Sequence, residues 1–546
     1  MSDSNLLDRR RFLEFMGRTG ALAGLAGIST AFLGACTSPR GLGAAIPGLP
    51  FTPLLPMTED DLVLAPGFES RVLIAWNDSV TPGEKFGFNN DFIGVIPIND
   101  TETYLWVNHE TADPQFVSGH LYYDPAAKKT RAQADLEMRA VGGSLLHARR
   151  DEADGDWRIV KNSGLNARFD AHTTIPFANA ARVKNSRFAI GTLANCSGGV
   201  TPWGTFLTCE ENYHHFYGEA VFDEQGRRTL KPPRAQLSWS GFFPRPPEHY
   251  GWVVEIDPKT RKAVKHTSLG RFAHEGATCV PTADGTCVVY MGDDTDNECF
   301  YKFIATKPGS LTEGTLYVAN LEAGQWIPLD PERTPALKAR FRSVAELRVR
   351  TREAAKLAGG TPLDRPEDCE IDPVTGAVIV ALTNNIDAGR PFGQLLKIEE
   401  TGGDHRALTF KSSTFRAGGT DTGFACPDNL CFDRAGNLWM TTDISDEKMN
   451  QGVYAPFGNN ALFVIPMKGR LAGQAFRVAS APRDAELTGP CFSPDGGTLF
   501  LSVQHPGANS KMPEMLTSHW PGGGSTIPKP AVVAIRGPAL DAITKA

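Results

Sequence analysis

Acidic side chains are concentrated in a few short segments of this sequence. One of these segments also contains cysteine. Cys196 opens the first of these segments, which ends in Cys209-Glu210-Glu211-Asn212 after a strand-like run. A thiolate combined with carboxylates suits a transition metal such as iron, whereas carboxylates alone suit Ca²⁺. Taken alone, an acid at the end of a strand is more often a solvated turn residue.

The other acidic segments lie far apart in the sequence. They are His274-Glu275, the run from Asp293 and Asp294 to Glu298, Arg365-Pro366-Glu367-Asp368, Pro427-Asp428-Asn429, and Glu486 with Gln504-His505 downstream. The run from Asp293 to Glu298 resembles a calcium loop in composition, but it lacks the spacing of an EF-hand. If the segments converge in one cavity, their like charges repel unless a divalent or trivalent cation neutralises them. If they do not converge they are exposed loops, and the sequence leaves both interpretations open.

The elements that must position these segments are short strands. Runs such as Arg71–Trp76, Thr103–Val107 and Trp252–Ile256 are rich in β-branched and aromatic residues, and turn-forming residues bound them. This composition is typical of strands in an all-β protein.

A weak repeat in the C-terminal half indicates how the strands are grouped. An Asp-rich turn with glycine precedes a strand at Asp284, Asp372, Asp433 and Asp495. The last three turns lie roughly 60 residues apart, the length of one four-stranded propeller blade with long loops. We therefore predict an all-β fold, a β-propeller with long loops, and the alternative is a set of unrelated hairpins in a sandwich. In a propeller the inner strands face a central channel, where polar residues from distant segments can meet.

The wider gap between the first two repeats predicts a small helical insertion at about residues 330–360. Ser343 is a suitable N-cap, Glu346 completes a capping box, and Gly359-Gly360 ends the helix. We interpret this helix as an insertion that decorates the propeller without chemistry of its own.

The N-terminus has the features of an export signal. Arg9-Arg10-Arg11-Phe12-Leu13 has the twin-arginine form, and the weakly hydrophobic run Gly20–Phe32 is too short to span a bilayer stably. Leu33-Gly34-Ala35-Cys36 resembles a lipobox, so Cys36 is a candidate for lipidation. The alternatives are a plain cleaved signal without a lipid and a chance run of arginines before a helix.

These features divide the chain into three parts. We predict a twin-arginine signal with a lipobox-like end over residues 1–36, a tether over 37–65 and a single propeller domain over 66–546. The protein is then exported by the twin-arginine machinery and is either periplasmic or a lipoprotein held at the membrane only through Cys36.

The composition of the chain limits the kinds of molecule that we expect it to bind. The chain is 41% hydrophobic and 21% charged, with a formal net charge of -7, and it has no block of Lys and Arg beyond the N-terminus. This balance is ordinary for a globular protein and argues against a nucleic-acid partner. We expect a monomer that acts on a small molecule.

The segments together resemble the PhoX family of alkaline phosphatases. The matching segments, in the order of the family, are Phe86–Asp91, Trp106–Glu110, Asn195–Asn212, Tyr250–Glu255, His274–Ala277, Gly292–Asp294, Arg365–Asp368, Cys426–Leu430, Glu486–Pro490 and Gln504–Gly507. An ordered set across most of the chain is more specific than any one segment. The twin-arginine signal also fits, because the family is exported in that way.

The resemblance implies a propeller whose channel holds Fe³⁺ and Ca²⁺ and which hydrolyses phosphate monoesters, releasing inorganic phosphate outside the cytoplasm. It implies Cys196 as the thiolate ligand of iron, with Cys209 as the competing thiolate. The implied carboxylate ligands of iron or calcium are Glu211, Glu275, Asp293, Asp294, Glu367 and Glu486. Arg365 is implied to bind phosphate, because a guanidinium group matches two phosphate oxygens and keeps its charge.

Two other functions remain open at this point. A calcium-propeller hydrolase acting on phosphotriesters or lactones needs no thiolate, and a non-catalytic surface protein uses a propeller face only for binding. The chain has no G-x-S-x-G elbow and no P-loop, which agrees with a reaction that needs no serine nucleophile.

Overall fold

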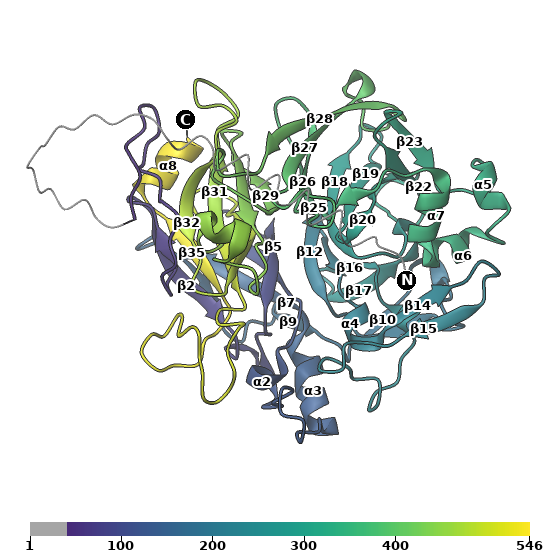
Figure 1. Cartoon of the computed structure of the whole chain (residues 1–546), viewed down its shortest axis with the longest axis horizontal. Coiled ribbons are helices and arrows are strands. Elements are labelled where there is room, and N and C mark those ends of the chain that lie inside the picture. The colour runs from purple at the N-terminus through teal and green to yellow at the C-terminus, as the bar shows by residue number, and fades with distance from the viewer. Residues whose placement is uncertain (1–40, 546) are drawn as a thin grey trace, which may run out of the picture. The chain divides into compact units, whose positions relative to one another are not determined.

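The computed structural model describes residues 41–545, and six antiparallel sheets of this part of the chain surround a central channel (Figure 1). The predicted β-propeller is therefore confirmed. Residues 1–40, with the twin-arginine motif and Cys36, lie outside the described residues.

Each sheet is one blade, and the first strand named for each blade is the innermost. Blade one has β5 (Asn90–Pro97), β6 (Glu102–His109), β7 (Gly142–Arg150) and β8 (Trp157–Ile159), and β9 (Ala167–Phe169) also pairs with β7. Blade two has β12 (Asn195–Val200), β13 (Phe206–Glu210), β16 (Val253–Asp257) and β17 (Lys262–His266). Blade three has β18 (His274–Pro281), β19 (Cys287–Asp293), β21 (Phe300–Ala305), β22 (Gly314–Asn320) and β23 (Gln325–Pro328).

The remaining three blades follow the same plan. Blade four has β25 (Pro366–Ile371), β26 (Val378–Leu382), β27 (Gln394–Glu400) and β28 (Phe410–Ala417). Blade five has β29 (Pro427–Phe432), β30 (Leu438–Thr442), β31 (Ala461–Ile465), β32 (Phe476–Ser480) and β1 (Val63–Leu64). Blade six has β33 (Glu486–Phe492), β34 (Leu499–Gln504), β35 (Ala531–Arg536) and β2 (Glu69–Ala75).

The ring is closed by strands from both ends of the described chain. β2 pairs with β35, so an N-terminal strand completes the last blade, and β33 of that blade packs beside β5 of the first. Closure of this kind leaves only short, protected sheet edges.

The hydrophobic core lies mainly between neighbouring blades. Trp106 of blade one is fully buried and stacks on Phe206 of blade two, with ring centroids 6.3 Å apart. Val254 and Ile256 of β16 belong to the same cluster. Because each blade uses both faces in this way, its middle strands are buried along almost their whole length.

Residues 41–65 differ from the tether that the sequence predicted. Phe51 and Leu54 are each only 6% exposed and belong to the core of blades five and six. The Leu54 backbone N–H donates a hydrogen bond to the carbonyl of Arg477, at 3.0 Å, and β1 extends blade five. The Pro- and Gly-rich composition concealed these apolar anchors, and residues 41–65 are part of the folded body.

This packing predicts an effect on stability that a tether would not show. Leu54→Ala should lower the free energy of unfolding by about 2 kcal/mol or more, because it leaves a cavity in a buried cluster. The neighbouring Leu55 is 48% exposed, so Leu55→Ala should change stability by less than about 0.5 kcal/mol. Thermal or urea unfolding of the two variants checks the prediction, and equal stabilities would contradict it.

The helical insertion comprises α5 (Pro335–Lys338), α6 (Val344–Val349) and α7 (Thr351–Ala358). The helix predicted as continuous from Ser343 to Gly359 is divided at Arg350, whose backbone is not helical. Its predicted ends hold, because the Ser343 side chain accepts a hydrogen bond from the Glu346 N–H, and Gly359 adopts the left-handed conformation at φ 88°. The insertion is not only decoration, since it carries Arg352 to the site described below.

Short elements complete the described chain. The other helices are α2 (Pro114–Val117), α3 (Arg131–Ala140), α4 (His214–Tyr217) and α8 (Pro538–Thr544). The small two-stranded ribbons are β3 (Ser79–Thr81) with β4 (Glu84–Lys85), β10 (Thr174–Pro176) with β11 (Phe188–Ile190), β14 (Glu219–Phe222) with β15 (Arg228–Lys231), and β20 (Asp296–Glu298) with β24 (Leu363–Asp364). No helix among residues 41–545 is long and apolar enough to cross a membrane.

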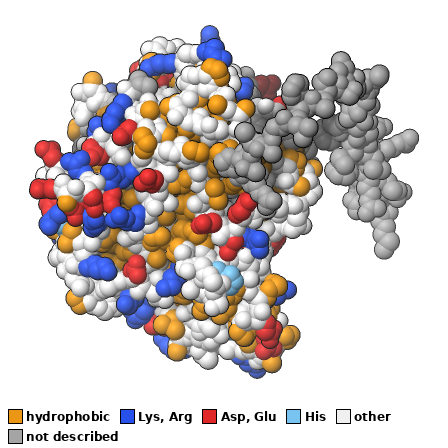
Figure 2. Space-filling view, turned by 90° about the vertical axis from the view of Figure 1, so that its left-hand side faces the viewer, with side chains coloured by type: hydrophobic (Ala, Val, Ile, Leu, Met, Phe, Trp, Pro, Cys, Tyr) orange, Lys and Arg blue, Asp and Glu red, His pale blue; other side chains and the backbone are white. Residues whose placement is uncertain are grey.

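On the side of blades five and six, the outer surface of the described residues has no large patch of a single charge. Figure 2 looks onto this side, where Lys and Arg lie beside Asp and Glu around a band of hydrophobic side chains. Intermixed charges of this kind give only a weak long-range field.

Candidate active site

The innermost strands of all six blades begin with the same irregularity. Pairing with the next strand breaks near the start of β5, β12, β18, β25, β29 and β33, as between Asn90 and Ile93 in β5. A β-bulge re-aims side chains at the break, and bulges are common beside active sites. The residues at these breaks in the first five blades are Asp91, Cys196, Glu275, Glu367 and Asp428. The repeated break therefore presents one thiol and four carboxyl groups at one end of the channel.

A second repeated feature precedes these strands. Asn89, Ala194, Arg365 and Cys426 each lie one position before an inner strand, and all four have left-handed backbones with φ between 43° and 54°. For residues other than glycine this conformation costs on the order of 1 kcal/mol. Its recurrence in four blades shows that the turn into the channel requires it.

The acidic segments converge. Three groups of side chains have ligand atoms within 4.8 Å of one another: Asp91 with Glu110 and Cys196, Cys196 with Glu211 and Glu275, and Glu275 with Glu367 and Asp428. Because Cys196 and Glu275 each belong to two groups, the three groups form one continuous cluster. Of the two interpretations that the sequence left open, the structure supports the shared cavity.

Two carboxyl groups at the centre of the cluster, Glu275 and Glu211, lack some or all of the hydrogen-bond donors that buried carboxyl groups need. Both carboxyl oxygens of Glu275 and one of Glu211 are buried without a hydrogen-bond partner. Burial, together with the neighbouring carboxylates of Glu367 and Glu211, raises the pKa of Glu275 well above its usual value. Burial likewise raises the pKa of Asp91 to about 7. Orphaned, mutually repelling carboxyl groups fit a site that is completed by cations.

The two candidate thiolates have different surroundings. The Cys196 Sγ lies 3.2 Å from a carboxyl oxygen of Asp91, inside the cluster. Cys209 is fully buried in the hydrophobic core of blades two and three. Geometry therefore brings Cys196, and not Cys209, to the carboxyl groups.

Arg365 supplies positive charge at the edge of the cluster. Its Nε and Nη2 donate to the two carboxyl oxygens of Asp294, at 2.8 and 2.9 Å. Nη2 also lies 3.0 Å from Glu367 and 3.4 Å from Asp443. The predicted residues Asp294, Glu367 and Arg365 thus meet at one place.

Asp293, Asp294 and Glu486 were also predicted as metal ligands, and none of them belongs to the three groups. Asp293 is the last residue of β19 and pairs with the guanidinium of Arg352 on α7. The next residue, Asp294, follows the end of the strand and contacts Arg365 instead. Asp293 therefore positions the guanidinium group of Arg352 and is not part of the cluster.

Glu486 lies at the far end of the cluster. Burial raises the pKa of Glu486 and that of the neighbouring Asp428 well above their usual values, and the charge of Glu486 raises the pKa of Asp428 further. His505 Nε2 lies 3.4 Å from Glu486, and its Nδ1 contacts the carbonyl of Asp484 at 3.0 Å. His274 is fully buried, with Nε2 2.9 Å from the Gly270 carbonyl, so it supports the packing of β18.

Sequence reasoning did not name Asp91, Glu110 or Asp443 as members of the site, and it noted the segment of Asp428 without naming this residue as a ligand. A signal for two of them existed, because Asn90-Asp91 and Pro427-Asp428 repeat the arrangement of His274-Glu275 at the start of an inner strand. Glu110 and Asp443 follow middle strands and enter through loops, for which the sequence carries no comparable signal.

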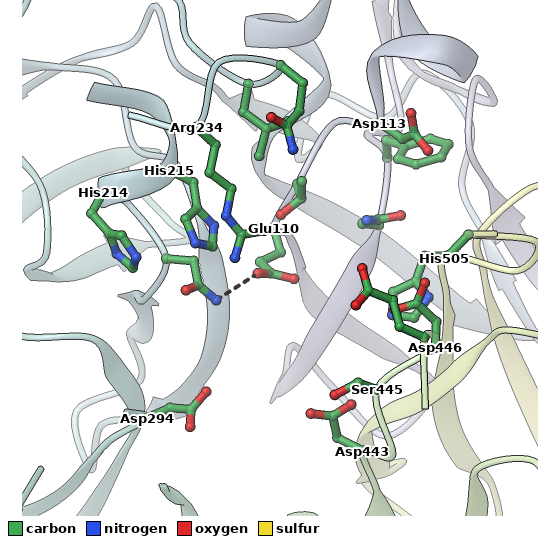
Figure 3. Close-up of a pocket in the computed structure, with 18 of the residues that line it drawn as sticks. Glu110, Asp113, His214, His215, Arg234, Asp294, Asp443, Ser445, Asp446 and His505 are labelled. Carbon is green, nitrogen blue, oxygen red and sulfur yellow. Dashed lines mark hydrogen bonds between the residues drawn. The ribbon is translucent and has the colours of Figure 1, made fainter. Parts of the chain in front are cut away.

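A pocket of about 830 Å³ lies over this end of the channel. Glu110, Asp294 and Asp443 line it together with residues of loops from blades one, two, five and six (Figure 3). Arg365, which pairs with Asp294, also lines it. The opposite end of the channel opens into a separate pocket of about 400 Å³ lined by residues of all six inner strands.

A closed six-bladed propeller with a buried thiol and carboxyl groups at one end of its channel defines a class of propeller enzymes whose sites suit metal ions. The sequence pattern of alkaline phosphatase PhoX matches residues 49–507. The chain therefore belongs to the PhoX alkaline phosphatase family and is a phosphomonoesterase.

Comparison with solved structures gives the same family. Pseudomonas fluorescens PhoX in complex with vanadate, a transition state analogue, matches with a TM-score of 0.79 and 29% identity over 90% of this chain and 98% of that chain. A gluconolactonase from Xanthomonas campestris matches at 11% identity with a TM-score of 0.33, over 90% of this chain and 99% of that chain. This second likeness is too low to bear on function. A comparison with curated proteins found no match.

Proposed function

We propose that this phosphomonoesterase uses Fe³⁺ and Ca²⁺ held by the carboxyl–thiol cluster, and that Arg365 binds the phosphate group of a small phosphate ester. The observation that carries the proposal is Glu275, whose two buried oxygens have no protein donor although it joins two potential ligand groups. A buried carboxylate in this position needs cations on both sides.

The chemistry of the ligand atoms, sulfur or oxygen, indicates which part of the cluster would hold which metal. Cys196, Glu211 and Glu275 would hold iron, since a thiolate with carboxylates suits a transition metal. Calcium would be held by the remaining carboxyl groups, namely Glu367 and Asp428 with the neighbouring Glu486 on one side, and Asp91 with Glu110 on the other side, where Cys196 is shared with the iron site. Bound cations would neutralise the carboxylates and stabilise the charge on the phosphoryl oxygens during transfer.

Arg365 is suited to position the phosphate. Its planar guanidinium group is held in the pocket by Asp294 and Glu367, so little side-chain freedom is lost when phosphate binds. Phosphate would take over N–H donors that contact Asp294 and Glu367 in the structure, and two parallel donors would then match two phosphoryl oxygens while the group keeps its charge.

The proposal includes export in folded form through the twin-arginine motif, with Cys36 as the site of a lipid anchor and no other membrane attachment. It also includes a monomeric enzyme without a nucleic-acid partner. Mass spectrometry of the mature N-terminus tests the export and anchoring, because a lipidated Cys36 as the first residue is the expected result. A mature chain cleaved elsewhere without lipid would contradict it.

Elemental analysis of exported protein tests the metal assignment. Cys196→Ser should lose iron and most hydrolysis of p-nitrophenyl phosphate, since a hydroxyl is a poor substitute for a thiolate. Cys209→Ala is the matched control and should keep both metals, because Cys209 lies in an apolar core. Unchanged iron and turnover in Cys196→Ser would overturn the assignment and favour a calcium-only hydrolase. Turnover that survives removal of all metal by a chelator would overturn the metal proposal as a whole.

Calcium binding to the metal-free protein should strengthen as the pH rises from about 6 to about 8. Burial raises the pKa of Asp91 to about 7 and that of Asp428 well above its usual value, so these carboxyl groups must release protons before they bind a cation. The affinity then increases by up to about tenfold per pH unit for each proton released. Calorimetry in two buffers of different ionisation enthalpy measures this proton release, and a pH-independent affinity would contradict the prediction.

A further inference from the structure

Two cationic side chains on one wall of the large pocket have no partner. Lys231 and Arg234 line the pocket, and within residues 41–545 neither side chain forms an ion pair or a hydrogen bond. The other two cationic Lys or Arg side chains that line it are engaged, because Arg352 pairs with Asp293 and Arg365 with Asp294.

The backbone fixes these free cations in place. Lys231 is the last residue of β15 and pairs with Glu219 of β14. After Pro232-Pro233, the Arg234 N–H donates to the His215 carbonyl at 3.0 Å, and the Arg234 carbonyl accepts from Ser238 at 2.9 Å. The backbone thus fixes where each side chain begins, while its charged end stays free to contact a ligand.

The pocket is electrically asymmetric. Figure 3 shows His214, His215 and Arg234 together on one side and Asp113 and Asp446 on the other. Glu447 also lines the pocket beside Asp446. An anionic substituent on a substrate is attracted to the first wall and repelled by the second.

The positive charge of the first wall comes from Lys231 and Arg234 alone. The rings of His214 and His215 lie 4.3 Å apart. Burial lowers the pKa of His214 to about 4 and that of His215 to about 3, so both rings are neutral near pH 7. The histidines thus offer a flat surface and hydrogen bonds but no charge.

The pocket also has room beyond the phosphoryl group. Its volume of about 830 Å³ is in the range of pockets that hold a whole drug-sized ligand. With the scissile phosphate on Arg365, the alcohol part of the ester must occupy the space between the two walls.

We propose that Lys231 and Arg234 form a second anion subsite, which binds another phosphate group on the alcohol part of the substrate. The inference rests on the proposed phosphate position at Arg365 and adds a substrate class, phosphate monoesters that carry a second phosphate. The Arg234 guanidinium provides two parallel donors for phosphate oxygens, and the Lys231 ammonium adds a point charge.

The test compares fructose 6-phosphate with fructose 1,6-bisphosphate on the metal-loaded enzyme. The wild type should show a higher kcat/KM for the bisphosphate, and Arg234→Ala should lower the ratio of the two values by roughly tenfold. Arg234→Lys should retain part of the preference, and adding Lys231→Ala to Arg234→Ala should remove the rest. Raising the ionic strength should reduce the preference of the wild type more than that of the double variant.

Arg227→Ala is the matched control. Arg227 lies in the turn between β14 and β15, pairs with Asp223 and is 77% exposed outside the pocket, so its replacement should leave the ratio unchanged. A wild type without preference for the bisphosphate, or an unchanged ratio in Arg234→Ala, would overturn the inference while the proposed function stands. Absence of phosphate release from both substrates would overturn the proposed function and this inference with it.

Discussion

Replacing Arg365 by alanine should lower kcat/KM for p-nitrophenyl phosphate by roughly 10³-fold, the effect expected when an arginine that stabilises a phosphoryl group is lost. Arg365 is the cation that the structure places against Asp294, Glu367 and Asp443 in the pocket. Under the proposed function, the carboxyl–thiol cluster keeps its ligand groups without Arg365, but the phosphate loses its guanidinium partner. Most of the loss should therefore persist at saturating substrate.

Lysine should not rescue this loss, since an ammonium group cannot make two parallel hydrogen bonds from one plane. Arg390→Lys serves as the control, because Arg390 also pairs with a carboxylate of the same blade, Asp364, but lies outside the pocket. Steady-state kinetics with metal content measured on the same samples checks both variants. An Arg365→Lys enzyme with wild-type kcat/KM would show that Arg365 acts only as a neighbouring charge.

Replacing Glu275 by glutamine should remove metal and activity together, with kcat/KM falling more than about 100-fold. Loss of groups that merely orient metal ligands already costs about 10–100-fold, and Glu275 joins two of the three ligand groups. Glutamine keeps the size of the side chain but removes the negative charge, so the cations on both sides lose a ligand.

The control for this experiment is Glu370→Gln. Glu370 is on β25, an inner strand like the β18 that carries Glu275, but it lines the pocket at the opposite end of the channel. Its replacement should leave iron and calcium content at the wild-type level. A Glu275→Gln protein with full metal content and turnover would show that the cluster is not the metal site.

Much of this site could be predicted from the sequence, because its ligands lie in short segments that the chain keeps intact. Cys196, Glu211, Glu275 and Glu367 were predicted from such segments, and the structure brings all four together. The propeller could be predicted as well, because the strand period and the turn at the start of each repeat are local properties of the sequence.

The errors of the sequence analysis have one physical origin. Asp293 and Asp294 are adjacent, and only the folded structure shows that Asp293 contacts Arg352 while Asp294 contacts Arg365. Residues 41–65 mix apolar side chains with Pro and Gly, and only the position of blade five shows that Phe51 and Leu54 are anchors. In both cases the decisive contact joins residues that are remote in sequence.

The sequence by itself determined the type of protein: a propeller that carries acids and a thiol in ordered segments. Only the tertiary structure decided which acids meet, because closing the ring brings the first residues of six inner strands to one end of a channel. The bulge at each of those starts then turns the side chains of Asp91, Cys196, Glu275, Glu367 and Asp428 toward one another. Side-chain direction at a bulge depends on the partner strand, so composition and spacing cannot specify it.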